Sequence, residues 1–226
     1  MLRLKSKHRI KCGDSTSEAD VADLMDGAKA DMVFTDPPYP FFTYPGANAN
    51  YEMEYQIPEF EQWACHFRSF LTENSDIFVM SNNRNVKRMM TVLEDNCFKI
   101  HNILIMVKNT GFPHQWYTAN HEFVLYYYQG KSVLPIKQCK SSIFDIKMPT
   151  PKERVHKSQK PVSMISEIIE NHPFKKVYEP FLGSGSTLIA CEKTERRCYG
   201  MEIDTKYMNV ILKRYSDYCG GSIVKA

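Results

Sequence analysis

The sequence contains no long hydrophobic run: nowhere do eighteen apolar residues follow one another, and no apolar segment follows the basic start "MLRLKSKHRIK". A secretory signal and a membrane-spanning helix are therefore not expected. The seven cysteines form no C-x-x-C pair and their number is odd, which argues against a disulfide framework and a structural zinc site. A soluble protein of the reducing cytoplasm is expected, with no metal site.

Repeats and low-complexity tracts are also missing, so the chain is expected to fold by ordinary core formation. With 226 residues, 43% of them apolar and 24% charged, it fits one domain, predicted to span 1–226. Charge is unevenly spread along the chain. Segment 131–160 carries eight basic and two acidic residues, a net charge of +6, so the remainder of the chain has a net charge of −3 and the whole chain +3. Such a segment suits a phosphate backbone, although a solvated lysine-rich loop explains it equally well.

Strand-like and helix-like segments alternate along the chain. The seven predicted strands, rich in β-branched or aromatic residues, are 9–13, 31–35, 76–80, 98–107, 121–128, 175–181 and 197–203. The predicted helices are 17–28, 58–72, 84–95, 161–172, 185–195 and 205–218. This alternation predicts a mostly parallel, Rossmann-like α/β sheet with sites at the carboxyl ends of its strands. No long helix separates 98–107 from 121–128, so these two are expected to form an antiparallel edge hairpin.

Two stretches interrupt this pattern with unusual turns. In "TDPPYP", two prolines follow Asp36 and impose a stiff extended turn directly after a strand. In "YEPFLGSGST", Gly183 and Gly185 allow close backbone approach just before a helix. The second stretch lacks the lysine of a P-loop and the third glycine of a dinucleotide-binding loop. An acid at the end of the next strand, Glu202, stands where a nucleoside ribose is held, which predicts an adenosine-containing cofactor without a pyrophosphate.

Five motifs in one order carry a family resemblance: "CGDS" (12–15), "TDPPY" (35–39), "HKSQKPV" (156–162), "EPFLGSGST" (179–187) and "GMEID" (200–204). The chain resembles the DNA amino-methyltransferases of the β arrangement, in which the catalytic motif precedes the S-adenosylmethionine motif. The segment before and through 121–128, with Glu122 in a His-Glu pair, resembles the family's late hairpin. The sequence departs from the family where Glu179 replaces a more frequent aspartate, and where Lys157 and Ser158 replace proline and threonine.

The resemblance implies a catalytic turn and a cofactor site. Asp36 and the carbonyl of Pro37 would accept the hydrogens of the target amine, held in place by Pro38, and Tyr39 would stack on a base flipped out of double-stranded DNA. Phe41, Phe42 and Tyr44 either add to this pocket or pack the loop. The residues that the resemblance assigns to S-adenosylmethionine are Asp14, Ser15, Gln159, Lys160, Pro161, Glu179, Phe181, Gly183, Ser184, Gly185, Ser186, Thr187, Glu202 and Ile203.

Individual roles follow from the same resemblance. Glu202 would accept from the ribose, Asp14 would lie at the adenine, and Gln159 with Lys160 would hold the methionine carboxylate. Asp14 could instead cap the helix at 17–28, a role open equally to Ser15 and Ser17. His121 and His156 are better explained as a strand residue and a loop residue than as metal ligands.

In this family, aspartate before Pro-Pro-Tyr goes mostly with adenine, serine mostly with the 4-amino group of cytosine, and asparagine with amide nitrogens in proteins. Adenine in DNA is therefore the expected target, and the 4-amino group of cytosine is the alternative. A different hypothesis is that the protein is a non-catalytic module that binds nucleic acid. DNA recognition is expected from the segment 131–155 and a mobile loop at 40–57. A homodimer and a companion restriction nuclease are compatible with the resemblance, but no residue indicates either.

Overall fold

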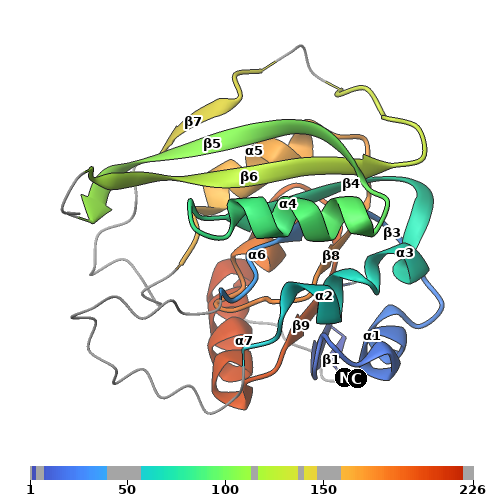
Figure 1. Ribbon diagram of the computed structural model, residues 1–226. Coiled ribbons are helices and arrows are strands. Elements are labelled where there is room, and N and C mark those ends of the chain that lie inside the picture. Colours follow the sequence, from blue (N-terminus) through green and yellow to red (C-terminus); the bar gives the residue numbers. More distant parts are fainter. Residues whose placement is uncertain are drawn as a thin grey trace.

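The computed structural model describes residues 2–3, 8–39, 57–112, 117–136, 140–146 and 159–220. Within these residues the core is one sheet of nine strands in the order β1-β2-β9-β8-β3-β4-β6-β5-β7 (Figure 1). The strands are β1 (Leu2–Arg3), β2 (Arg9–Cys12), β3 (Ala30–Thr35), β4 (Leu71–Ser81), β5 (Lys99–Phe112), β6 (Ala119–Gln129), β7 (Ile143–Ile146), β8 (Lys176–Glu179) and β9 (Arg197–Glu202). Neighbouring strands are parallel except at β1–β2, β4–β6 and β5–β6.

Helices cover both faces of the sheet. They are α1 (Glu18–Met25), α2 (Phe60–Ala64), α3 (Phe67–Phe70), α4 (Val86–Asp95), α5 (Val162–Glu170), α6 (Ser186–Lys193) and α7 (Thr205–Cys219). Buried side chains of α1 to α4 form one core cluster with one face of the sheet, and those of α5 to α7 form a second cluster with the opposite face. The fold is therefore a three-layer α/β arrangement.

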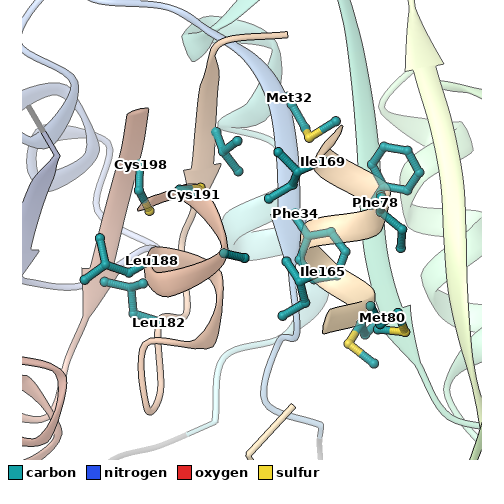
Figure 2. Packing of buried hydrophobic residues seen from close by; sticks show 14 of the residues in the cluster. Met32, Phe34, Phe78, Met80, Ile165, Ile169, Leu182, Leu188, Cys191 and Cys198 are labelled. Carbon is teal, nitrogen blue, oxygen red and sulfur yellow. The ribbon is translucent and has the colours of Figure 1, made fainter. Parts of the chain in front are cut away.

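The α5 face shows how the sequence pattern builds this packing. Ile165 and Ile169 stand one helical turn apart, so both point to the same side of α5. Figure 2 shows them against Phe34 of β3 and near Phe78 of β4, whose side chains leave the sheet on that face. All four side chains are at most 1% exposed. Burial of such side chains stabilises a fold by roughly 1.5–3 kcal/mol each, before conformational entropy is counted.

The chain order of the strands decides where a ligand could bind. From β3 the chain continues to β4 on one side, whereas from β8 it continues to β9 on the other side. Because β3 and β8 are adjacent and parallel, the connections leaving their carboxyl ends diverge, and in sheets of this kind ligands bind at such a point. Asp36 follows β3 and Glu179 ends β8, so the two turns that the sequence singled out meet at this switch point.

The predicted α/β class, the mostly parallel sheet and the antiparallel pairing of the hairpin are confirmed, and all seven predicted strands are present. Two details were wrong. Two short strands that were not predicted, β1 and β7, bring the sheet to nine strands. Because β7 pairs with β5, the β5–β6 hairpin does not form the edge of the sheet. The predicted helix 58–72 is instead two short helices, which a turn at Cys65 and His66 separates, and it ends early because Leu71 already begins β4. Of the described helices, none is long and apolar enough to cross a membrane.

Candidate active site

The catalytic turn predicted at Asp36 lies directly after β3. The Tyr39 hydroxyl donates a hydrogen bond to Asp36 Oδ1 over 3.0 Å, so the turn folds its aromatic ring back beside its own carboxylate. Burial raises the pKa of the Asp36 carboxyl above its usual range, and burial together with that carboxylate raises the pKa of Tyr39. Tyr39 therefore stays a neutral donor, and one oxygen of Asp36 already has a partner.

The second oxygen of Asp36 faces a lysine from a distant part of the chain. Lys160 Nζ lies 3.2 Å from Asp36 Oδ2 and 2.8 Å from Oε2 of Glu122 in β6. Burial alone would lower the pKa of Lys160, but the two carboxylates outweigh burial and raise it. Lys160 is therefore a fixed positive charge that two acids share, and it offsets part of the cost of burying Asp36.

The loop after β8 is organised by the buried carboxylate of Glu179. It accepts hydrogen bonds from the backbone N–H of Phe181 over 3.0 Å and from the Thr187 hydroxyl over 2.8 Å. Burial nevertheless raises the pKa of Glu179 to about 8. Phe181 packs edge-on against Trp63 with ring centroids 5.2 Å apart, which ties the loop to α2. Glu179 thus joins the end of its strand to the first turn of α6.

Gly183 and Gly185 take backbone conformations that other residues rarely adopt, with φ of 53° and 81°. Gly185 is the N-cap residue of α6, and a Cβ atom there would meet Ile211 at 3.4 Å. A Cβ atom at Gly183 would meet the carbonyl oxygen of Phe181 at 4.0 Å, an ordinary contact, so the positive φ and not crowding is what favours glycine there. The Ser186 hydroxyl donates to the carbonyl oxygen of Lys160 over 2.9 Å, which joins this loop to the segment before α5.

Glu202 ends β9 and reaches back to the same loop. Its Oε2 accepts the backbone N–H of Gly183 over 2.7 Å, and its Oε1 accepts that of Asp204 over 3.1 Å. Burial raises the pKa of the Glu202 carboxyl. The next residue, Ile203, is 43% exposed, unusually open for an isoleucine beside a buried acid. A buried acceptor and an exposed apolar side chain thus stand next to each other.

The segment after β2 lies beside these elements. The Ser15 hydroxyl donates to the carbonyl oxygen of Pro180, which links it to the loop after β8. Asp14 Oδ1 accepts from the backbone N–H and the hydroxyl of Thr16, both over 2.8 Å. The N-cap of α1 is Ser17, so the structure decides against Asp14 and Ser15 for that role.

The structure therefore brings the catalytic turn, residues 159–161, the glycine loop and the ends of β2 and β9 to one edge of the sheet. Gln159 precedes Lys160 in this segment, Pro161 is the N-cap residue of α5, and Ser184 accepts hydrogen bonds from Arg214 of α7 through its carbonyl and its hydroxyl. The loop 40–56 and residues 156–158, with His156, lie outside the described residues. Roles assigned to the cofactor-binding residues stay predictions.

Two residues that join this cluster, Glu122 and Lys108, were not among the site residues predicted from the sequence. Lys108 Nζ donates to Glu122 Oε1 over 3.0 Å, so Glu122 contacts two lysines. The register pairs Met106 with Glu122, and Lys108 two residues on lies on the same face as Glu122. Leu104 and Met106 are alternate residues of β5 that face the core, and Lys108 is the next residue in this pattern. A lysine at such a position is the signal that could have revealed Lys108.

Among the described residues, no group of three His, Cys, Asp or Glu side chains is placed to hold a metal ion. The acids at the sheet edge are instead matched by lysines and backbone N–H groups.

Comparison with known proteins assigns the chain to a family. The family model described as DNA methylase matches residues 30–213, from the first residue of β3 into α7. The chain belongs to this family. Its members are DNA amino-methyltransferases of the N6/N4 type. The Type II methyltransferase M2.MboI of Moraxella bovis is 24% identical over 221 residues, covering 83% of this chain and 81% of that protein.

Two solved structures have folds similar to this one. A complex of M1.HpyAVI with S-adenosylmethionine matches with a TM-score of 0.73 and 23% identity, over 91% of this chain and 98% of that one. The cytosine-N4-specific PvuII DNA methyltransferase matches with a TM-score of 0.62 and 12% identity, over 94% of this chain and 93% of that one. At these identities the likeness concerns the fold, and the fold does not by itself distinguish adenine from cytosine.

Proposed function

We propose that this DNA methylase transfers a methyl group from S-adenosylmethionine to the exocyclic 6-amino group of adenine, after the base has been flipped out of double-stranded DNA. The observation that carries the proposal is the Asp36 carboxylate at the switch point of the sheet, fixed by Tyr39 and Lys160 beside the glycine loop. An amine whose lone pair is delocalised into a base ring needs acceptors for its hydrogens before it attacks. Asp36 is such an acceptor, held in advance in one place.

The residues at the sheet edge suit S-adenosylmethionine. The glycines at 183 and 185 would let the methionine part approach the backbone closely, the buried Glu202 would accept from the ribose, and the exposed Ile203 would cover an apolar face of the adenine. Asp14 would lie at the adenine amino group, with Ser15 next to it. When bound, the cofactor supplies an electrophilic methyl group.

The chain's own residues supply orientation and charge. Asp36 and the carbonyl of Pro37 accept the hydrogens of the amine, and the prolines limit how far these acceptors can move. Tyr39 offers a face on which a flipped base stacks. No strong base is required before transfer, because the methylated amine is acidic enough to lose its proton afterwards.

DNA contacts are assigned to segments 131–155 and 40–57. Most of the second and part of the first lie outside the described residues, but β7 shows that part of 131–155 is a strand of the sheet. Lys140 donates to Glu167 of α5 over 2.7 Å, so at least one lysine of the basic segment already has an acidic partner. A homodimer and a companion nuclease are compatible with this function, but neither is part of the proposal.

Adenine is preferred over cytosine because aspartate, not serine, precedes Pro-Pro-Tyr. The test is to incubate the protein and S-adenosylmethionine with unmethylated genomic DNA, digest the DNA to nucleosides and separate the methylated products by mass spectrometry. We expect N6-methyladenine. N4-methylcytosine would establish the alternative target, and absence of both would support a non-catalytic binding module. Single-molecule sequencing of the same DNA would then give the recognition sequence.

A further inference from the structure

Four side chains from four elements form a row of alternating charges at the proposed catalytic centre. In order they are Asp36 after β3, Lys160 before α5, Glu122 in β6 and Lys108 in β5. Their side chains are only 25%, 14%, 20% and 12% exposed. In so sheltered a place each ion pair is screened less than at the surface, so removing one member disturbs its neighbours.

Lys160 is shared unequally between its two acids. Its Nζ is 2.8 Å from Glu122 and 3.2 Å from Asp36, so the shorter contact goes to the acid that does not belong to the catalytic turn. Lys108 occupies the other oxygen of Glu122 at 3.0 Å, which leaves Oε2 to face Lys160. Two lysines are thus anchored on Glu122, and only one of them also reaches Asp36.

This sharing matters because Asp36 has two opposing requirements. It must stay ionised although burial raises its pKa, and Lys160 supplies the positive charge that favours ionisation. It must also accept a hydrogen from the target amine, and an ammonium held tightly by Asp36 alone would compete for that acceptor. Glu122 draws Lys160 towards itself and so relieves this competition.

We propose that Glu122 is a positioning residue, which holds the Lys160 ammonium between two carboxylates so that Asp36 keeps a neighbouring positive charge and still stays open to the target amine. Lys108 serves the same arrangement by fixing the orientation of Glu122. The inference rests on the proposed function, since it assigns Asp36 the role of acceptor. It adds a role for two strand residues, Lys108 and Glu122, which are not proposed to contact the base.

The test compares single-turnover methyl transfer by the unaltered protein, Glu122→Gln, Lys160→Met and the double variant, at saturating S-adenosylmethionine and DNA, from about pH 6 to about pH 9. Besides Lys160, the charged or titratable groups that influence Asp36 are Glu122, Tyr39 and Glu179. Glu122→Gln should slow the reaction on the order of a hundredfold, because Lys160 then closes on Asp36. Cofactor affinity is measured separately for every variant, because Glu122 contacts Lys160, which is itself predicted to hold the methionine carboxylate, and rates are compared only at saturating cofactor.

The double variant distinguishes positioning from a merely structural role. Lys160→Met should displace the acidic limb of the pH profile to higher pH, because Asp36 loses a neighbouring positive charge. At high pH the double variant should be faster than Glu122→Gln, since the competing ammonium is gone. If Glu122 only supports the fold, the reductions in rate caused by Glu122→Gln and Lys160→Met should add in the double variant. A double variant slower than Glu122→Gln at every pH would therefore overturn the proposal.

Controls keep the result interpretable. Asp217→Asn removes the same charge from the exposed Lys213–Asp217 pair of α7, where the carboxylate is 66% exposed, and should leave the rate unchanged. Should Glu122→Gln fail to fold in a thermal unfolding assay, Lys108→Gln replaces it and should slow transfer in the same direction. A rate within about threefold of the unaltered protein for the variant tested would also refute the inference. Inactivity of the unaltered protein towards adenine would instead refute the proposed function.

Discussion

Glu202 at the end of β9 accepts the backbone N–H of Gly183, in the loop after β8, over 2.7 Å. The two residues are nineteen positions apart, and the bond closes the loop against the neighbouring strand. Its second oxygen accepts from Asp204, so the carboxylate is fixed before any ligand arrives. Each carboxylate oxygen has two lone pairs, and therefore capacity remains for a ribose hydroxyl.

Replacing Glu202 with alanine should weaken S-adenosylmethionine binding by about 1.5–3 kcal/mol, the scale of a hydrogen bond to a charged group. It should also lower the unfolding temperature, because the Gly183 N–H loses its partner. Isothermal calorimetry and thermal unfolding measure the two effects. The control is Glu73→Ala, which replaces an exposed acid near the amino end of β4. It should change neither the cofactor affinity nor the unfolding temperature. Unchanged cofactor affinity in Glu202→Ala would remove this residue from the site.

Asp36→Ala should abolish methyl transfer while cofactor affinity stays within about tenfold, because the lost acceptor acts on the amine and not on the cofactor. The expected reduction of the single-turnover rate is at least a hundredfold, on the scale of one preorganised hydrogen-bonding group removed from a transition state. Lys160 keeps Glu122 as a partner in this variant, so the fold should be retained. Calorimetry of cofactor binding with a methyl-transfer assay checks both parts, and an active Asp36→Ala protein would contradict the assignment.

Much of this site was predictable from the sequence because its parts are local. A strand followed by Asp-Pro-Pro-Tyr, and one followed by a glycine-rich turn, need only neighbouring residues to be recognised. The Lys160 contacts are different: the sequence indicated its place near the cofactor, whereas its pairing with Asp36 and Glu122 arises when three distant segments meet. Lys108 was missed for the same reason.

The fold shows the same division between local and tertiary causes. The buried strands and amphipathic helices were predicted because their patterns are strong within ten residues or so. The four-residue strand β7 was not, since residues 143–146 become a strand only by pairing with β5. The segment 58–72 reads as one helix, but the chain leaves helical geometry at Leu71, whose ψ of 153° begins β4.

Glu179 should make the stability of the protein depend on pH. Its pKa is raised to about 8 in the fold, against about 4.3 for an exposed glutamate, so the unfolded chain releases its proton first as pH rises. This group therefore lowers the unfolding free energy as pH rises from about 4.5 to about 8, by at most about 1.4 kcal/mol per pH unit. Above that range its contribution is constant.

Glu179→Gln should remove this decline, because the amide keeps an acceptor for the Phe181 N–H but carries no proton to release. Urea unfolding at about pH 5.5, 6.5 and 7.5 measures the difference between the two proteins, which should grow in favour of the variant as pH rises. Glu73→Gln serves as the exposed control. Parallel pH dependences for Glu179→Gln and the unaltered protein would show that Glu179 is ionised in the fold across this range.

The basic segment provides the last test. If Lys152 and Arg154 contact DNA phosphates, each should contribute about 0.9 to the slope of log affinity against log salt, so replacing both with glutamine should flatten the slope by nearly two. Lys140→Gln should have a smaller effect than either, because Lys140 is already paired with Glu167 and must leave that acid to reach a phosphate. Base preference should barely change, since phosphate contacts carry no sequence information directly. DNA binding across a salt series measures the slope for both the double variant and Lys140→Gln. An unaltered slope would make the segment a solvated lysine-rich loop, whereas a changed recognition sequence would place these side chains on base edges in a groove.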